Sequence, residues 1–181
     1  MGGLRATILA GLVLSLASRS FAAFRTSVKF NNNKLPGDRQ STDGSYELIS
    51  SSFSLGQAVS KTNTGFQTGV PSQGAVVLTK LGDEWDPTFE YFELASVQAA
   101  RLSNVVISTV RLSGERSVPV FDIQLTNAYI TSNEFTMTGG NEETYSISLN
   151  YETITVINYN TRGGSTVKTQ TSYNFLQKRA T

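Results

Sequence analysis

The chain contains neither histidine nor cysteine among its 181 residues. Without histidine it cannot form a Ser-His-Asp triad, and it lacks the commonest general base and metal ligand. Without cysteine it has no disulfide, no thiolate nucleophile, no cysteine-bound zinc and no iron–sulfur cluster. Its formal net charge of +1 is too small for nucleic acid binding that depends on neutralising phosphates. The composition therefore points away from catalysis and from nucleic acid partners.

The chain also lacks an apolar run long enough to cross a bilayer as a helix, which takes about 20 residues. The uncharged run from Ala6 to Ala17 has 12 residues, follows Arg5, and leads into small residues that end at Ala22 and Ala23. This pattern is typical of a secretory signal peptide over residues 1–23. We expect cleavage after Ala22 or Ala23, and a secreted or extracytoplasmic mature domain, residues 24–181, without a stable membrane anchor. A buried N-terminal helix is the alternative.

What the chain has in abundance is 22 serines, 21 threonines and 15 glycines, which together are typical of a β-rich protein with many turns. Alternating apolar and polar residues predict strands over 24–30, 46–55, 75–80, 104–112, 118–128, 129–137, 144–159 and 167–176. The polar segment 61–73 reads as a long exposed loop, with Phe66 and Val70 as its large apolar residues. These spacings predict a single closed or nearly closed antiparallel β-barrel, or a sandwich.

One segment has the signature of a helix. Asp86 is a favourable N-cap, and Pro87 follows at the first helical position, where its missing N–H costs nothing. The spacing predicts one short helix over about 87–99. Phe89, Phe92 and Ser96 would form a stripe that packs on the barrel.

Two strand patterns bear on the core. Positions 145, 147, 149 and 151 are apolar or aromatic and predict a core-facing strand, and Ile154 and Val156 then continue on even numbers. A β-bulge near Glu152-Thr153 would explain this change of phase and would help to curve a barrel. Within 46–55 we expect one face to carry Ile49, Phe53 and Leu55.

Acidic residues form two clusters: Asp83, Glu84 and Asp86, and Glu142 with Glu143. Paired carboxylates could serve glycoside hydrolysis or bind calcium. However, the first cluster precedes a helix, where negative charge is favoured by the helix dipole, and the second follows a glycine turn. The sequence therefore assigns no catalytic, cofactor-binding or metal-binding residue.

Aromatic residues offer a different function. Trp85 and the tyrosines could stack on sugars if they lay in a row on an exposed sheet. Tyr145 and Tyr151 instead alternate with Ile147 and Leu149, as expected of a core strand. A secreted carbohydrate-binding β-sandwich is therefore our alternative function.

Four segments occur in an order found in one known family. Glu47 to Gly56 contains the pattern Glu-x-x-Ser followed by Ser-Phe-Ser-x-Gly, and a strand later ends in Leu-Thr-Lys at Lys80. The segment from Asp83 to Pro87 opens the expected helix, and Glu143 to Ile154 forms a late strand. Over about residues 26–159 the chain resembles the Hcp family, the tube proteins of bacterial type VI secretion systems, which are related in fold to phage tail-tube proteins.

The resemblance implies a β-barrel with one helix that assembles into a six-membered ring. Such rings stack into a tube, use no cofactor, and can hold small effector proteins in the lumen. In that family a long loop contacts the neighbouring ring. On this chain the corresponding ring-stacking residues would be Gly65, Phe66, Gln67, Gly69 and Val70. The expected partners are copies of the chain, secretion-machine components and small protein effectors.

Two features depart from the family pattern. Members of the family leave the cytoplasm through the secretion machine itself, whereas this chain begins with a signal for general export. The segment after Tyr159 has no clear counterpart. An Hcp-like protein that works outside the cytoplasm would reconcile the resemblance with the export signal.

Overall fold

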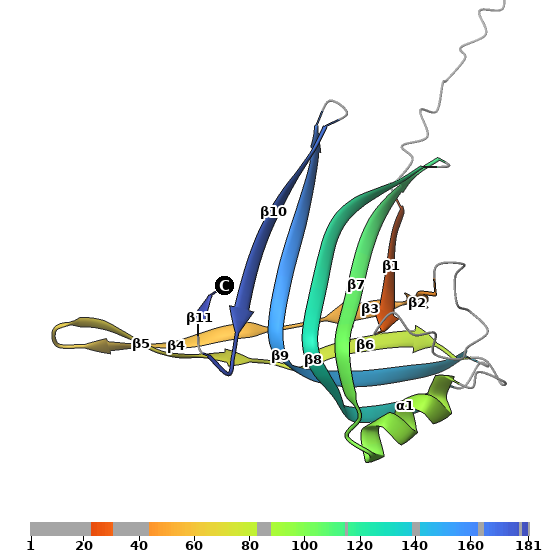
Figure 1. Ribbon diagram of the computed structural model, residues 1–181, viewed down its shortest axis with the longest axis horizontal. Helices are drawn as coiled ribbons and strands as arrows, with labels where there is room; N and C mark the ends of the chain where they lie inside the picture. The colour runs from red at the N-terminus through yellow and green to blue at the C-terminus, as the bar shows by residue number, and fades with distance from the viewer. Residues whose placement is uncertain are drawn as a thin grey trace, which may run out of the picture.

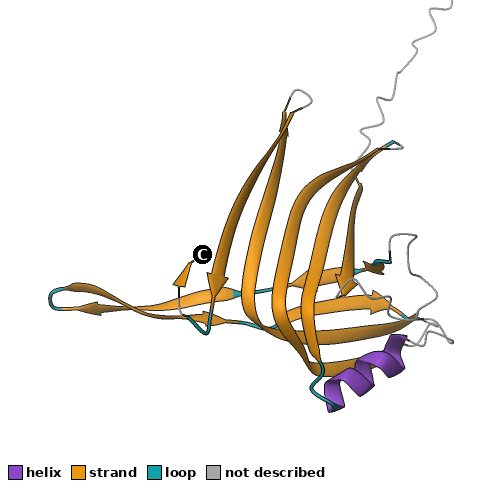
Figure 2. Ribbon diagram, in the orientation of Figure 1, coloured by secondary structure: helices purple, strands orange, loops and turns teal. Residues whose placement is uncertain are grey.

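The computed structural model describes residues 23–30, 44–82, 88–114, 116–138, 142–162, 165–177 and 179–180. The elements, in chain order, are β1 (Ala23–Phe30), β2 (Tyr46–Leu48), β3 (Ser50–Ser52), β4 (Leu55–Thr62), β5 (Gly65–Gln73), β6 (Val76–Leu81), α1 (Thr88–Val97), β7 (Arg101–Ser113), β8 (Arg116–Thr138), β9 (Glu142–Arg162), β10 (Ser165–Asn174) and β11 (Arg179–Ala180). Strands dominate these residues, and α1 lies beneath the curved sheet (Figures 1 and 2). The mainly β fold with one short helix confirms the predicted class.

The main sheet is antiparallel and curls back on itself. Strands β2, β1, β7, β8 and β9 are neighbours in that order, and the first half of β9 also pairs with β6. The path closes because β2 pairs with β1 and the next strand, β3, pairs with β6. Ile49, between β2 and β3, donates its N–H to the carbonyl of Thr79 at 2.9 Å. One short stretch of chain thus joins the two ends of the sheet and gives the predicted barrel.

Two long strands give the sheet its curvature. The expected strands 118–128 and 129–137 are one continuous strand, β8, which bends sharply with its partner β9 (Figure 1). Asn127 lies at this bend with φ of 53°, a left-handed conformation that asparagine adopts more readily than most residues. The prediction of two separate strands was wrong, because the backbone bends here while β8 stays paired with β7 and β9.

The predicted β-bulge is also displaced. The change of phase in β9 is present, since Tyr151 and Ile154 are both buried. Yet β8 and β9 keep the same register on either side of Glu152, and their register shifts between Ile130 and Ser132 instead. The irregularity that accompanies the bend therefore lies in the partner strand, so its predicted position was wrong.

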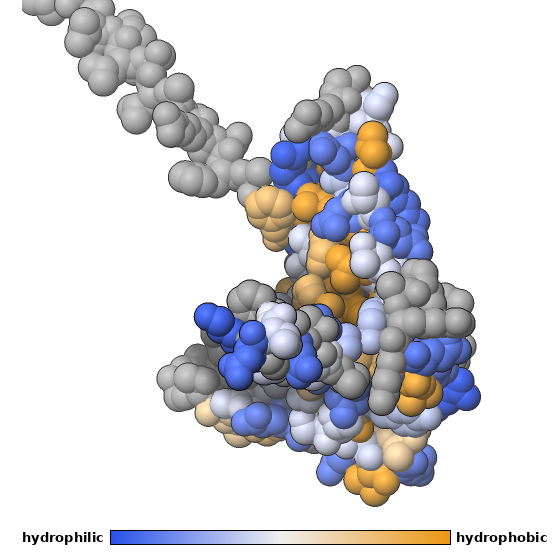
Figure 3. Space-filling model, turned by 90° about the vertical axis from the view of Figure 1, so that its left-hand side faces the viewer, coloured by the Kyte–Doolittle hydropathy of each residue, from blue (hydrophilic) through white to orange (hydrophobic). Residues whose placement is uncertain are grey.

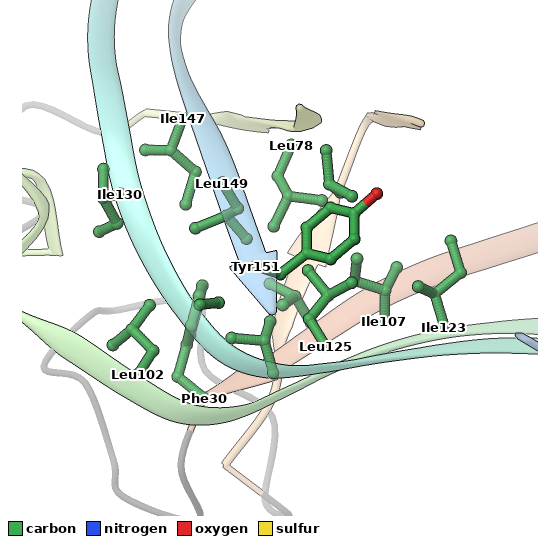
Figure 4. Packing of buried hydrophobic residues seen from close by; sticks show 14 of the residues in the cluster. Phe30, Leu78, Leu102, Ile107, Ile123, Leu125, Ile130, Ile147, Leu149 and Tyr151 are labelled. Carbon is green, nitrogen blue, oxygen red and sulfur yellow. The ribbon is translucent and has the colours of Figure 1, made fainter. Parts of the chain in front are cut away.

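A single apolar core fills the barrel. Leu149, Leu125 and Val105 are completely buried, and side chains from β1, β6, β7, β8 and β9 converge on them (Figure 4). Tyr145, Ile147 and Leu149 are buried together, which confirms the core-facing pattern. A cavity of about 10 Å³ remains beside Ile147, which is room for roughly one water molecule. The described interior is thus packed with side chains.

The helix packs on the barrel as expected. α1 contacts β8, and its Phe92 and Ala95 are buried. The Phe92 ring meets that of Phe30 edge-on at a centroid distance of 5.4 Å. Its bounds, Thr88–Val97, agree with the predicted helix over 87–99, while the cap residues Asp86 and Pro87 lie outside the described residues.

The segment 46–55, predicted as one strand, is divided. It forms two short strands, in which Tyr46 and Leu48 point into the core while Ile49, Phe53 and Leu55 are exposed. The chain pairs with β1 through β2 and, only a few residues later, with β6 through β3. The corner between β2 and β3, at Ile49, breaks the alternation that a continuous strand would keep.

The last predicted strand is confirmed as β10. It pairs with the second half of β9, from Ser165 opposite Arg162 to Asn174 opposite Thr153. The short strand β11 then pairs with the end of β10, at Tyr173 and Asn174. The C-terminal segment therefore extends the wall of the barrel beyond the part that closes through β6.

Candidate assembly surface

The most distinctive surface feature is a β-hairpin formed by β4 and β5. These strands pair with each other as a separate two-stranded sheet and extend away from the barrel (Figure 1). Thr62 pairs with Gly65 across a two-residue loop, and Gly65 has φ of 136°, a conformation that strongly favours glycine. The prediction of an irregular loop over 61–73 was therefore wrong, because cross-strand pairing orders a segment whose apolar alternation is weak.

The hairpin is anchored where it leaves the barrel. Gly74 donates its N–H to the carbonyl of Ser54 at 2.9 Å, and the Tyr151 hydroxyl donates to the Gly74 carbonyl at 3.2 Å. Within the hairpin, the Gln57 side chain donates to the Gly69 carbonyl at 2.9 Å. These bonds fix the direction in which the hairpin leaves the barrel.

All five predicted ring-stacking residues lie on β5. Gln67 and Gly69 are exposed, and Gly65 begins the strand. The side chains of Phe66 and Val70 lie outside what the structure describes. Sequence reasoning missed Val59, an exposed apolar residue of β4, and assigned Leu55 to the strand 46–55 rather than to the hairpin.

Next to the hairpin base lies an open depression of about 400 Å³, lined by Gln73, Arg101, Asn127, Tyr129, Asn150, Tyr151, Glu152 and Leu176. Asn127 bonds to two of the other lining residues. The Asn127 side-chain oxygen accepts a bond from the Arg101 guanidinium at 3.0 Å, and its amide donates to Glu152 at 2.6 Å. Asn174 donates to the other Glu152 oxygen at 3.2 Å. These bonds, that of Asn127 first, lower the pKa of Glu152.

The network of Arg101, Asn127, Glu152 and Asn174 connects four strands, and we interpret it as structural rather than catalytic. Arg101 begins β7, Asn127 lies at the bend of β8, Glu152 lies on β9, and Asn174 ends β10. Each charged or amide group is already engaged by a neighbour, so the arrangement is well suited to holding the bend. It positions the hairpin base through the adjoining Tyr151.

The family-like Leu-Thr-Lys motif also has a structural role. Lys80 is buried, and its ammonium lies 5.6 Å from the centre of the Tyr145 ring, within range of a cation–π interaction. Just after β6, Gly82 donates its N–H to the carbonyl of Glu143 at 2.8 Å, which extends the pairing with the start of β9.

The acidic clusters do not form a site within the described residues. Asp83, Glu84 and Asp86 lie outside them, as does the side chain of Glu142, while Glu143 lies at the start of β9. Across the described part of the chain, no three acidic side chains gather closely enough to hold a metal ion. In the same residues, no helix is long and apolar enough to cross a membrane.

Comparison with solved structures shows which known proteins share this fold. A protein described as a "type six secretion system protein" superposes with a TM-score of 0.76 at 17% identity, covering 88% of this chain and 100% of the other. Hcp1 from Salmonella typhimurium gives a TM-score of 0.68 at 10% identity, covering 89% and 100%. The secreted protein Hcp3 from Pseudomonas aeruginosa gives 0.55 at 15% identity, covering 84% and 99%.

Sequence comparison identifies the family. No curated protein sequence matches the chain. The family described as "Type VI secretion system effector, Hcp" matches residues 29–157, which is most of the chain and includes the end of β1, the hairpin, α1, β7, β8 and most of β9. This match confirms the resemblance seen in the sequence motifs. The chain belongs to the Hcp family of type VI secretion system proteins.

Proposed function

We propose that this protein is a structural component that self-assembles into rings and stacks them into a tube, and that the β4–β5 hairpin makes contacts between copies. The observation that carries this proposal is the hairpin itself. An isolated two-stranded hairpin is at best marginally stable in water, yet this one extends away from the barrel as a sheet of its own. A partner surface would provide the packing that its own barrel does not.

The exposed residues of the hairpin fit this role. Val59 is 59% exposed and Leu55 is 47% exposed, although both are apolar. Exposed apolar patches mark interaction sites, and these two residues lie on one projecting strand. The ring of six copies, and a lumen that holds small effector proteins, are the further parts of the proposal that membership of the family supports.

The position of β1 is compatible with export. The strand begins at Ala23, which pairs with Leu112. Cleavage after Ala22 would leave every described pair of the barrel intact, whereas cleavage after Ala23 would remove the first one. We therefore propose a signal peptide that ends at Ala22 and a protein that works outside the cytoplasm. Mass spectrometry of the N-terminus of the secreted protein tests this assignment; an intact Met1 would contradict it.

Self-assembly is tested by sedimentation velocity and electron microscopy of Val59→Asp. A charge in a buried contact is costly, so this variant should dissociate at concentrations at which the unaltered protein assembles. At lower concentrations, where both are monomers, their melting temperatures should be equal. The control is Val167→Asp on β10, where the valine is 61% exposed. Unchanged assembly of Val59→Asp would remove the hairpin from the interface.

A secreted carbohydrate-binding protein remains the second candidate. Tyr129 is 39% exposed in the depression beside Asn150, an arrangement in which an aromatic ring and an amide could face a sugar. Binding on a glycan array that is lost in Tyr129→Ala would favour this function.

A further inference from the structure

We propose that the hairpin of one copy docks on the outer face of helix α1 of a second copy. The inference rests on the proposed self-assembly and names the surface that receives the hairpin. It follows from the chemistry of two surfaces that lie at separate places on the molecule.

The outer face of α1 is unusually apolar for an exposed helix. Leu94 is 54% exposed, Val97 is 82% exposed, and Tyr91 lies on the same side, because residues three apart in a helix are neighbours. The opposite side of α1 is also apolar, since Phe92 and Ala95 are buried against the barrel. Exposed apolar surface of this kind marks an interaction site. The outer face is therefore suited to being covered by a partner.

The helix face and the hairpin also differ in charge. Glu90 and Glu93 are exposed on α1, and the sequence from residue 82 to residue 100 contains five acidic residues and no basic one. The hairpin has the opposite character: from residue 55 to residue 79 its single charged residue is Lys61, which is exposed beside the turn. The helix face is acidic with exposed apolar residues, and the hairpin is basic with exposed apolar Leu55 and Val59, so the two surfaces are complementary in both respects.

The two surfaces belong to different copies. The hairpin extends away from the barrel on the side opposite α1, so it points away from its own helix (Figure 1). From the hairpin side, hydrophobic side chains are visible among polar ones on the barrel and at its lower edge (Figure 3). Contact between two unlike surfaces of the same chain is heterologous, and repeated contacts of this kind close into rings or continue as filaments.

Charge reversal tests the docking directly. K61E places like charges against Glu90 and Glu93, and should weaken self-association by about tenfold at low salt. The pair E90K and E93K should weaken it similarly, and combining all three changes should restore association to within about threefold of the unaltered protein. The matched control is K168E, which makes the same change on β10 and should alter association less than about twofold. Sedimentation velocity at two salt concentrations measures all of these constants.

Cross-linking provides a second readout, because the chain has no cysteine of its own. A tagged K61C protein mixed with an untagged E93C protein should form tagged–untagged dimers with a short bismaleimide linker, well above the dimers that either forms alone. Equal yields in the three samples would overturn the docking.

The outcomes separate this inference from the proposed function. If Val59→Asp abolishes assembly but charge reversal gives no rescue and no mixed dimers form, the hairpin assembles on another surface, and the docking on α1 is wrong. If the unaltered protein stays monomeric at every concentration, both proposals fail. Rescue by the combined charge reversal together with mixed dimers supports both.

Discussion

Truncation of Leu149 to alanine tests whether the barrel is packed as described. Leu149 is completely buried, and its strand is fixed on both sides, since it pairs with Val76 on β6 and with Ile130 on β8. Leu→Ala substitutions in cores cost about 2–5 kcal/mol, and the cost is greatest where the surroundings cannot collapse into the cavity. Two flanking ladders hold the backbone here, so we expect Leu149→Ala to lower the free energy of unfolding by about 3–4 kcal/mol.

Urea unfolding followed by circular dichroism measures this change, and an unchanged m-value would show that the folded barrel exposes the same surface on unfolding. The control is Leu176→Ala, the same substitution at a side chain that is 74% exposed, which should change stability by less than about 0.5 kcal/mol. A loss below about 1 kcal/mol for Leu149→Ala would refute the reasoning, because the side chain could not then be held between two ladders in a filled core.

Three further predictions concern the sites around the core and the hairpin base. Gly82→Ala should lower the melting temperature, because an added Cβ would lie 2.2 Å from a ring carbon of buried Tyr145; a stability equal to that of the unaltered protein would contradict this contact. Burial raises the pKa of Tyr151 to about 12, so the folded state holds a proton that the unfolded state loses above pH 10, and stability falls as pH rises. At pH 11 this should remove about 1.4 kcal/mol. In unfolding curves at pH 9 and 11, Tyr151→Phe should lose less stability than the unaltered protein by that amount, while the raised pKa values of Tyr46 and Tyr159 still make it lose some. The pKa of Glu152 is lowered by its bonds to Asn127 and Asn174, so its stabilising effect is present at neutral pH and is lost as pH falls through that lowered value. Glu152→Gln should therefore melt earlier at neutral pH and show a flatter decline in acid; a decline as steep as that of the unaltered protein would show that another carboxylate is responsible.

The sequence was most informative where one face of a strand is buried. The alternation from Tyr145 to Tyr151 correctly placed a core strand, and the cap and stripe around Phe92 correctly placed the helix. Both signals are local, since burial on one side imposes a period of two on strands and 3.6 on helices. The family motifs added the order of the elements.

The errors came from contacts between distant segments. The bend at Asn127 depends on partners from β7 and β9, so the sequence around it looks like an ordinary strand boundary. The corner at Ile49 exists because the two ends of the main sheet must be joined, which no local pattern encodes. The hairpin was read as a loop because its described side chains from Leu55 to Gly69 are exposed, so burial imposes no apolar alternation on them.

The central claim is that this Hcp-family barrel assembles with copies of itself through its hairpin. Its most direct test is the solution mass, measured by light scattering over a range of concentrations, with electron microscopy grids made from the same samples. We expect a mass of several copies, near that of a six-membered ring, with rings or short tubes on the grids, and a shift to the monomer for Val59→Asp. A strict monomer at every concentration would contradict the claim and leave the barrel without an assembly role.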